Sequence, residues 1–327
     1  MLKYRLFGRS GLSVSKIVFG GGRVGGIVIF AEDNVRRDAI RIAKEGGINW
    51  VDTAASYGDG KSEEALGWLL PEAGHKPYVS TKFSVDPGLG EDIPSQIERS
   101  LGESLTRLRR TNVNLLQLHN RIELVADGRG ITVDHILGKN GVADGLDRLR
   151  AKGVTGLQGI TALGDAACCK EVIASGRFDS AQVYHNLLNP SAARAMPPAW
   201  TGQNFDGLMK TCHDNGVAVL NIRVFAASII AAEERTGRES ILTKDTDIES
   251  EERKARAVFA TLGDEHGTRA QIALRFALSN SMVSCVVIGV AETFHVEEAI
   301  AAVDMGALPQ SALNALETLY ETDFGRA

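Results

Sequence analysis

The sequence predicts an α/β chain folded as a closed (β/α)8 barrel, the TIM-barrel architecture, with two additional helices and long loops at its carboxyl-terminal face. Short apolar or β-branched runs recur eight times, and a helical pattern follows nearly every one. No Pro/Ser-rich linker, low-complexity tract or charge block divides residues 1–327, which favours a single domain. Strands that alternate with helices form parallel sheets, and eight such units favour a barrel over an open, doubly wound sheet.

The eight expected strands are four to seven residues long and are bounded by turn residues, as buried strands of a parallel sheet should be. They cover residues 16–20, 49–52, 78–82, 114–119, 155–161, 181–184, 218–222 and 285–289.

The helical patterns between these strands often begin at Asp, Ser, Thr or Asn and end at Gly, which are the residues preferred at helix ends. They cover residues 34–45, 62–70, 93–108, 142–151, 165–174, 205–215, 268–279 and 293–303. Two further helical patterns, at 251–262 and 310–322, exceed the eightfold count.

Three irregular stretches, at 120–139, 187–204 and 225–250, are too long to be simple connectors. Each follows a strand, so in a barrel each leaves the carboxyl face, where substrates bind. Trp200 and Phe205 lie in or beside the second stretch and are candidates for a pocket wall. Surface loops that pack on themselves explain the pattern equally well.

Composition limits the classes of partner. The net charge is -5, and no long Lys/Arg cluster is present, which argues against nucleic acid or an anionic membrane as the main partner and favours a small molecule. The first residues lack the apolar core of a secretory signal, and no stretch approaches a membrane span, so we expect a cytoplasmic protein of undetermined oligomeric state. The four cysteines have neither disulfide nor zinc spacing and are expected to be buried, and no metal site is expected.

The stretch GINWVDTAASYGDGKSEEALG, residues 47–67, contains the first candidate site residues. Asp52 ends an expected strand, Tyr57 lies on the following loop, and a helix begins at Ser62. Catalytic groups of α/β enzymes lie on such loops, because a rigid sheet positions them at the mouth. Alternatively, Asp52 caps a turn and Tyr57 is half-buried packing.

Two more polar residues end expected strands: Lys82 in Tyr-Val-Ser-Thr-Lys and His119 in Leu-Leu-Gln-Leu-His. A single such residue is usually only a hydrogen-bonded polar group. Together with Asp52 and Tyr57 they make four polar side chains at one barrel mouth, which favours a catalytic site instead. The glycine-rich stretch at 20–26 lacks the sequence of a phosphate loop, so Gly21 and Gly22 are expected to approach a ligand closely.

The chain resembles the aldo-keto reductases along nearly its whole length. The resemblance rests on YRLFGRSGL, DTAASYGDGKSEEALG, STK, LLQLH, QGIT and VVIGVAETFHVEEAI. The sequence looks closest to the sugar and aldose dehydrogenase branch, which includes L-galactose and D-threo-aldose dehydrogenases. The resemblance implies a nicotinamide-dependent oxidoreductase that interconverts a carbonyl and an alcohol, on an aldose that becomes a lactone or on a small aldehyde.

The resemblance also implies a role for each candidate catalytic residue. Tyr57 would exchange a proton with the substrate oxygen, Lys82 would stabilise the phenolate, and Asp52 would hold Lys82 charged and in place. A neutral His119 would orient the substrate oxygen. Asn120 and Trp200 are the expected substrate contacts.

The cofactor side matches the family less completely. Ile222 and Arg223 stand where relatives have a ring-stacking aromatic and a serine, and Ala162 replaces an asparagine. The expected cofactor contacts are Gly21, Gly22, Thr161, Gln182, Ile222, Arg223, Phe225, Gly289, Val290, Ala291, His295 and Glu298. Residues 289–298 contain no Lys or Arg for a 2′-phosphate, and Glu292 would repel one, so NAD is expected to be accepted at least as well as NADP.

A second hypothesis is a catalytically idle, nicotinamide-binding regulatory subunit of the same fold, like relatives that bind ion channels. That hypothesis would be favoured if one of the four catalytic positions were lost. All four are present, which favours the enzyme.

Overall fold

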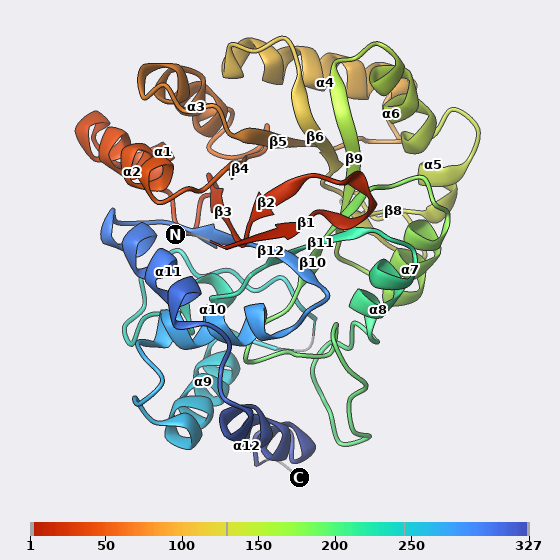
Figure 1. Cartoon of the computed structure of the whole chain (residues 1–327). Coiled ribbons are helices and arrows are strands. Elements are labelled where there is room, and N and C mark those ends of the chain that lie inside the picture. Colours follow the sequence, from red (N-terminus) through yellow and green to blue (C-terminus); the bar gives the residue numbers. More distant parts are fainter. Residues whose placement is uncertain (1–2, 129, 245, 326–327) are drawn as a thin grey trace.

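The computed structural model describes residues 3–128, 130–244 and 246–325. At its centre, eight parallel strands form a closed barrel, which confirms the predicted fold (Figure 1). Each strand lies within two residues of its predicted bounds at either end. In barrel order they are β3 (Ile17–Gly20), β4 (Trp50–Asp52), β5 (Tyr78–Phe83), β6 (Val113–Leu118), β9 (Thr155–Ala162), β10 (Ser180–Tyr184), β11 (Ala218–Ile222) and β12 (Val283–Gly289).

Helices surround this barrel (Figure 1). They are α2 (Asp33–Glu45), α3 (Lys61–Glu72), α4 (Ile93–Leu108), α6 (Val142–Ala151), α7 (Ala166–Ala174), α8 (Leu208–Asp214), α10 (Arg269–Ser279) and α11 (Phe294–Met305). Helix α8 begins three residues later than predicted, because Asp206 and Gly207 have left-handed backbone angles, with φ of 50° and 66°.

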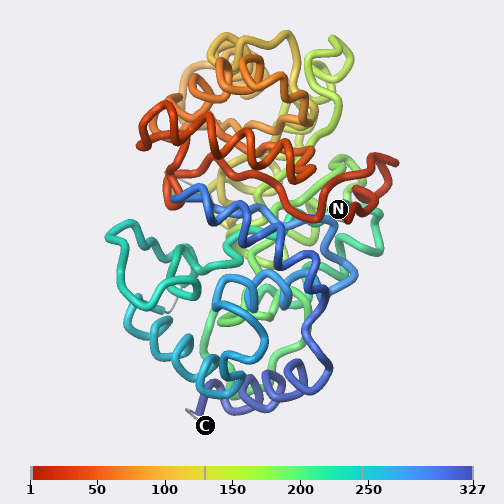
Figure 2. The backbone as a smooth tube through the Cα atoms, turned by 60° about the vertical axis from the view of Figure 1, so that its left-hand side comes forward, coloured from red at the N-terminus to blue at the C-terminus, as the bar shows by residue number. Residues whose placement is uncertain are grey.

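The two additional helices, α9 (Ile248–Leu262) and α12 (Gln310–Glu321), pack against each other. Figure 2 shows both at the end of the molecule opposite α3 and α4, with the carboxyl terminus beside them. They therefore lie outside the barrel and exceed its eightfold count, as predicted.

A hairpin that the sequence analysis did not predict covers the amino end of the barrel. Strands β1 (Tyr4–Leu6) and β2 (Ser13–Ser15) pair antiparallel around a short 3₁₀ turn, Gly8–Ser10. Phe7 between them packs on Trp50 inside the barrel, with ring centroids 4.7 Å apart. Val18, Leu115, Leu220 and Cys285 complete this interior cluster. Because apolar side chains fill the amino end, the polar groups of the interior lie toward the carboxyl end.

Short elements within the loops were also not predicted. They are α1 (Ile27–Phe30), β7 (Arg121–Ile122), β8 (Gly130–Ile131), α5 (Val133–Leu137) and the 3₁₀ turn η2 (Ala226–Ser228). Each has five residues or fewer, too few to show a period in the sequence.

The three long loops are joined to one another at the carboxyl face. An Arg121 guanidinium nitrogen donates to the carbonyl of Leu242 at 2.8 Å, and the Lys244 amide donates to Oε1 of Gln203 at 3.0 Å. Arg238 donates to the carbonyl of Gly25, in the loop after β3, at 2.8 Å. The segment after β11 therefore contacts the loops after β3, β6 and β10 and does not simply pack on itself. No helix in the described part of the chain has the length and apolarity to cross a membrane.

One buried histidine makes the fold sensitive to acid. His185 follows β10, is 2% exposed, and stacks on Phe276 of α10 with ring centroids 5.1 Å apart. Burial lowers the pKa of His185 to about 4. The unfolded chain, with an ordinary histidine pKa of about 6.5, binds this proton first. Stability present at neutral pH is therefore lost as the pH falls from about 6.5 toward 4.

We predict that His185→Gln reduces this acid sensitivity. Between pH 7 and pH 5, the free energy of unfolding should fall by about 1–2 kcal/mol more in the wild type than in the variant. Urea unfolding at both pH values measures the difference. The exposed His213 provides the control, because His213→Gln should follow the wild type. Equal pH dependence in wild type and His185→Gln would contradict the prediction.

Candidate active site

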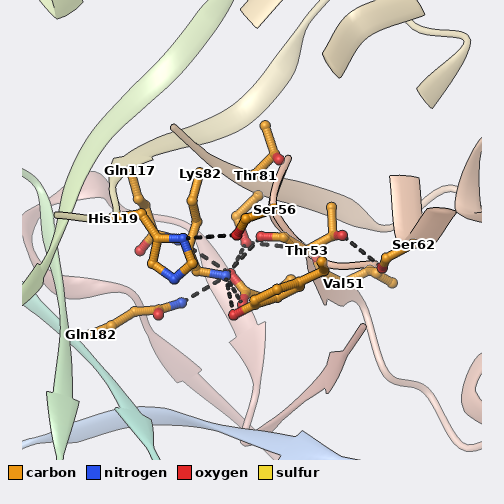
Figure 3. Close-up of polar contacts among 12 residues, drawn as sticks. Val51, Thr53, Ser56, Ser62, Thr81, Lys82, Gln117, His119 and Gln182 are labelled. Atoms are coloured by element: carbon orange, nitrogen blue, oxygen red, sulfur yellow. Dashed lines mark hydrogen bonds and ion pairs between the residues drawn. The ribbon is translucent and has the colours of Figure 1, made fainter. Parts of the chain in front are cut away.

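A buried ion pair joins the ends of two neighbouring strands. Asp52 is the last residue of β4, and Lys82 lies near the end of β5, which pairs parallel with β4. Lys82 Nζ lies 2.6 Å from Asp52 Oδ2, and neither side chain is more than 3% exposed. Lys82 Nζ also donates to the Thr53 carbonyl at 2.7 Å and lies 3.2 Å from Tyr57 Oη. The three ammonium protons thus have three oxygen partners (Figure 3).

The environment keeps Lys82 charged. Burial alone would lower the pKa of Lys82, but the negative charge of Asp52, together with contacts to Asp52 and Tyr57, outweighs that cost, so the pKa lies above its ordinary value. An ammonium group therefore faces the Tyr57 oxygen at every pH near neutrality.

Three uncharged donors also bind Asp52. Ser80 Oγ, Gln117 Nε2 and Gln182 Nε2 donate to Asp52 Oδ1 at 2.7, 3.2 and 3.0 Å. Ser80 and Gln117 were missed by the sequence analysis. Each lies two residues before a predicted catalytic residue, and side chains two apart share a face of a strand. That spacing is the signal that could have identified both.

Tyr57 lies on the loop between β4 and α3, half-buried, with its ring beneath Lys82 Nζ at 4.6 Å. Gly22 borders the same ring, because a Cβ added there would lie 3.6 Å from Tyr57 Cε2. The Gly21 amide donates to the Asp52 carbonyl at 2.8 Å. A side chain at Gly21 would collide with Ser62 Oγ at 2.4 Å. This glycine segment therefore lies close to the loop that carries Tyr57, and its approach to a ligand stays a prediction.

His119 follows β6 and meets Tyr57 edge to face, with ring centroids 5.7 Å apart. Burial, together with the nearby positive charge of Lys82, lowers the pKa of His119 to about 4. The imidazole is therefore neutral at pH 7 and has one donor and one acceptor nitrogen. Ser56 Oγ lies 3.4 Å from Nδ1. The structure thus brings the four predicted side chains, Asp52, Tyr57, Lys82 and His119, into one cluster.

Among the predicted cofactor contacts, Thr161 has a buried polar group without a partner in the described part of the chain. The Thr161 hydroxyl is buried, and no described residue bonds it. Thr161 pairs in register with Gln182 on the adjacent strand. A free hydroxyl beside the catalytic cluster fits the carboxamide of a nicotinamide. Ile222 is the last residue of β11, at the carboxyl end of the barrel, and packs half-buried against the core.

Three of the predicted cofactor contacts, Val290, His295 and Glu298, form hydrogen bonds within the chain. His295 Nδ1 accepts from the amides of Ala291 and Glu292, both at 3.2 Å. Glu298 Oε1 accepts from the Thr268 hydroxyl at 2.6 Å. The Val290 carbonyl accepts from the Ile27 amide at 3.0 Å. These contacts fix the loop that begins at Gly289 against α1 and α10.

Other predicted contacts have structural partners. Asn120 uses both ends of its amide on the Val85 backbone, at 2.8 and 2.9 Å, and so holds the loop after β5. Trp200 packs on Phe324, with ring centroids 6.1 Å apart, and lies beneath Lys254. These contacts join it to the carboxyl-terminal segment rather than to the catalytic cluster.

Phe225 and Arg223 both lie after β11. Phe225 is half-buried against the core, and Arg223 donates to Ser240.

Comparisons with known proteins agree with this geometry. The model of the aldo/keto reductase family matches residues 16–321. The chain is 26% identical to an L-galactose dehydrogenase of Arabidopsis thaliana, covering 98% of this chain and 95% of that protein. It is also 26% identical to a D-threo-aldose 1-dehydrogenase of a Pseudomonas species, covering 70% and 72%.

A solved aldo-keto reductase from Bacillus halodurans, in its holo form, has the same fold. Its TM-score is 0.76 at 19% identity, over 98% of this chain and 97% of that one. Since the family match extends over nearly the whole barrel and its surrounding helices, this chain belongs to the aldo/keto reductase family.

Proposed function

We propose that this protein interconverts a carbonyl and an alcohol with a nicotinamide cofactor, and that Tyr57 exchanges the proton. Aldo-keto reductases are oxidoreductases that use such cofactors, and the specific assignment rests on one observation. Tyr57 Oη lies 3.2 Å from an ammonium that Asp52 holds at 2.6 Å in a buried site. A phenol beside a fixed cation is suited to release and regain a proton, because the cation stabilises the phenolate.

The side chains have separate tasks. In reduction, Tyr57 gives its proton to the substrate oxygen as negative charge develops there, and Lys82 stabilises the phenolate that remains. In oxidation, the phenolate takes the proton from the alcohol. Neutral His119, whose ring meets that of Tyr57, donates a hydrogen bond to the same oxygen without adding a charge. Asp52 does not touch the substrate and acts by positioning Lys82.

Thr161 and Ile222 would hold the nicotinamide end of the cofactor. When bound, the nicotinamide supplies or accepts the hydride, which none of these side chains can carry. Gly22 leaves the Tyr57 ring uncovered on one side, where a side chain would otherwise stand.

We propose an aldose sugar, oxidised to a lactone, or a small aldehyde as substrate, in the cytoplasm. Support for the sugar comes from the two relatives named as sugar dehydrogenases, at 26% identity. An aldose panel with NAD and an aldehyde panel with reduced cofactor test this assignment directly.

The proton role predicts that Tyr57→Phe loses nearly all turnover, while cofactor binding stays within about threefold. Only the transferable proton is removed, and the ring remains. Absorbance assays measure turnover, and cofactor fluorescence measures binding. Tyr78→Phe is the matched control, because Tyr78 lies at the amino end of β5 and contacts Trp50. Turnover of Tyr57→Phe within tenfold of wild type would contradict the assignment of Tyr57 as the residue that exchanges the proton.

Lys82→Met is also predicted to lose turnover, and it leaves the Asp52 carboxylate buried without its cation. Removing one partner of such a pair costs about 3–5 kcal/mol of stability. The double variant Lys82→Met with Asp52→Asn should regain much of that stability but none of the activity. Urea unfolding and steady-state assays separate the two effects. A double variant with near wild-type rates would show that the ion pair has no part in turnover.

We propose that NAD is accepted at least as well as NADP, because residues 289–298 contain no cationic Lys or Arg. The His295 Nδ1 atom is moreover occupied by two backbone amides. The ratio of kcat/KM for the two cofactors on one substrate measures the preference. A preference for NADP above about tenfold, roughly 1.4 kcal/mol, would refute this proposal.

A further inference from the structure

Arg223 occupies an unusual position at the barrel mouth. It is the first residue after β11, and its φ of 62° lies in the left-handed region that disfavours side chains with a Cβ. Its carbonyl accepts from Asn186 Nδ2 at 2.9 Å, which fixes the backbone there. A non-glycine residue in this conformation is a reason to look for a function of its side chain.

The Arg223 guanidinium is half-buried without a counter-charge. Its hydrogen bonds go to the Ser240 carbonyl at 2.8 Å and to Ser240 Oγ at 3.3 Å, and both acceptors are neutral. Among the described residues, no carboxylate lies within 4.0 Å of it. A guanidinium has five N–H donors, so at least two remain for another acceptor.

Arg121 is a comparable arginine at the same face of the barrel. Like Arg223, it donates to the backbone of the segment after β11, at Leu242. Unlike Arg223, it has a carboxylate partner, Glu123, at 3.4 Å. Holding the loop therefore does not require an uncompensated charge, and Arg223 lacks, among the described residues, the carboxylate partner that Arg121 has.

The position of Arg223 places this capacity near the reacting groups. The residue before it, Ile222, ends β11 at the carboxyl end of the barrel. Burial lowers the pKa of Arg223, whereas Tyr184 and Tyr57 lie close enough for their phenolates to oppose that shift. Arg223 directly follows β11, so it lies at the carboxyl end of the barrel, the end whose loops carry the Tyr57 hydroxyl.

We propose that Arg223 binds the acidic group of the substrate, so that the preferred substrates are carbonyl compounds bearing a carboxylate, such as sugar acids or aldehyde acids. This inference rests on the proposed oxidoreductase function. A carboxylate provides two oxygens for the planar donors of a guanidinium, and a half-buried site strengthens that contact. A phosphate of the cofactor has the same chemistry, and the experiment distinguishes the two sources.

The kinetic test compares 4-carboxybenzaldehyde with methyl 4-formylbenzoate, which differ mainly in charge. The wild type should favour the acid at least tenfold in kcat/KM. Arg223→Gln should abolish that preference, because it should lower kcat/KM for the acid at least tenfold more than kcat/KM for the ester. Arg121→Gln, which removes a comparable loop contact, should retain the preference.

Two kinetic results would overturn the proposal. If Arg223→Gln weakens cofactor binding tenfold or more and slows both aldehydes equally, the anion belongs to the cofactor. If Arg121→Gln removes the preference as fully as Arg223→Gln does, only the loop contact matters.

A binding measurement separates this proposal from the oxidoreductase function. Calorimetry with benzoate and benzamide on the cofactor-loaded enzyme needs no turnover. Benzoate should bind at least tenfold tighter than benzamide in the wild type and in Arg121→Gln. In Arg223→Gln this difference should be lost. If benzoate shows this preference but no carbonyl compound is turned over, the anion site is supported and the proposed oxidoreductase function is refuted. Turnover without a preference for benzoate would refute the site alone.

Discussion

The buried contact between Lys82 and Asp52 is the interaction on which the rest of this structure depends. Removing two charges from water is expensive, and the cost is offset only if geometry and hydrogen bonding are nearly complete. The barrel meets this requirement with three oxygens around the ammonium and four donors around the carboxylate. These partners come from β4, β5, β6 and β10, so the ion pair also joins strands on opposite sides of the interior.

The two ends of the barrel have contrasting chemistry. At the amino end, Phe7 and the hairpin that carries it cover an apolar interior that contains Trp50. Toward the carboxyl end, the interior becomes polar and holds Lys82 and Asp52. Since the apolar layer keeps water from one side of the ion pair, the phenol and the imidazole face the other side, where the long loops meet. The direction from which a ligand approaches thus follows from how the interior is filled.

The sequence predicted the barrel because each strand and each long helix has its own local period and end signals. The hairpin was missed because its pairing joins Tyr4 to Ser15 across a turn and depends on what it covers. Of the four candidate catalytic residues, Asp52, Lys82 and His119 were predicted from strand ends and Tyr57 from the loop after one, and the topology brings them together. Gln117 was missed although its spacing from His119 indicates the same strand face. The contact of Asn120 with the Val85 backbone could not be predicted, since it depends on the distance between strands. Contacts between the long loops, such as that of Arg121 with Leu242, are tertiary and likewise could not be predicted.

Because Asp52 and Lys82 complete each other's bonding in the interior, folding alone gives a reason to retain them. A descendant of this chain that lost its chemistry would still need both, or would have to replace both together. Tyr57 is different, since its half-buried hydroxyl could be lost with little damage to the core. Mutational drift after loss of turnover should therefore appear first at the tyrosine. In related chains, an intact ion pair is evidence of a folded barrel, whereas under the proposed proton role the tyrosine reports whether turnover is retained.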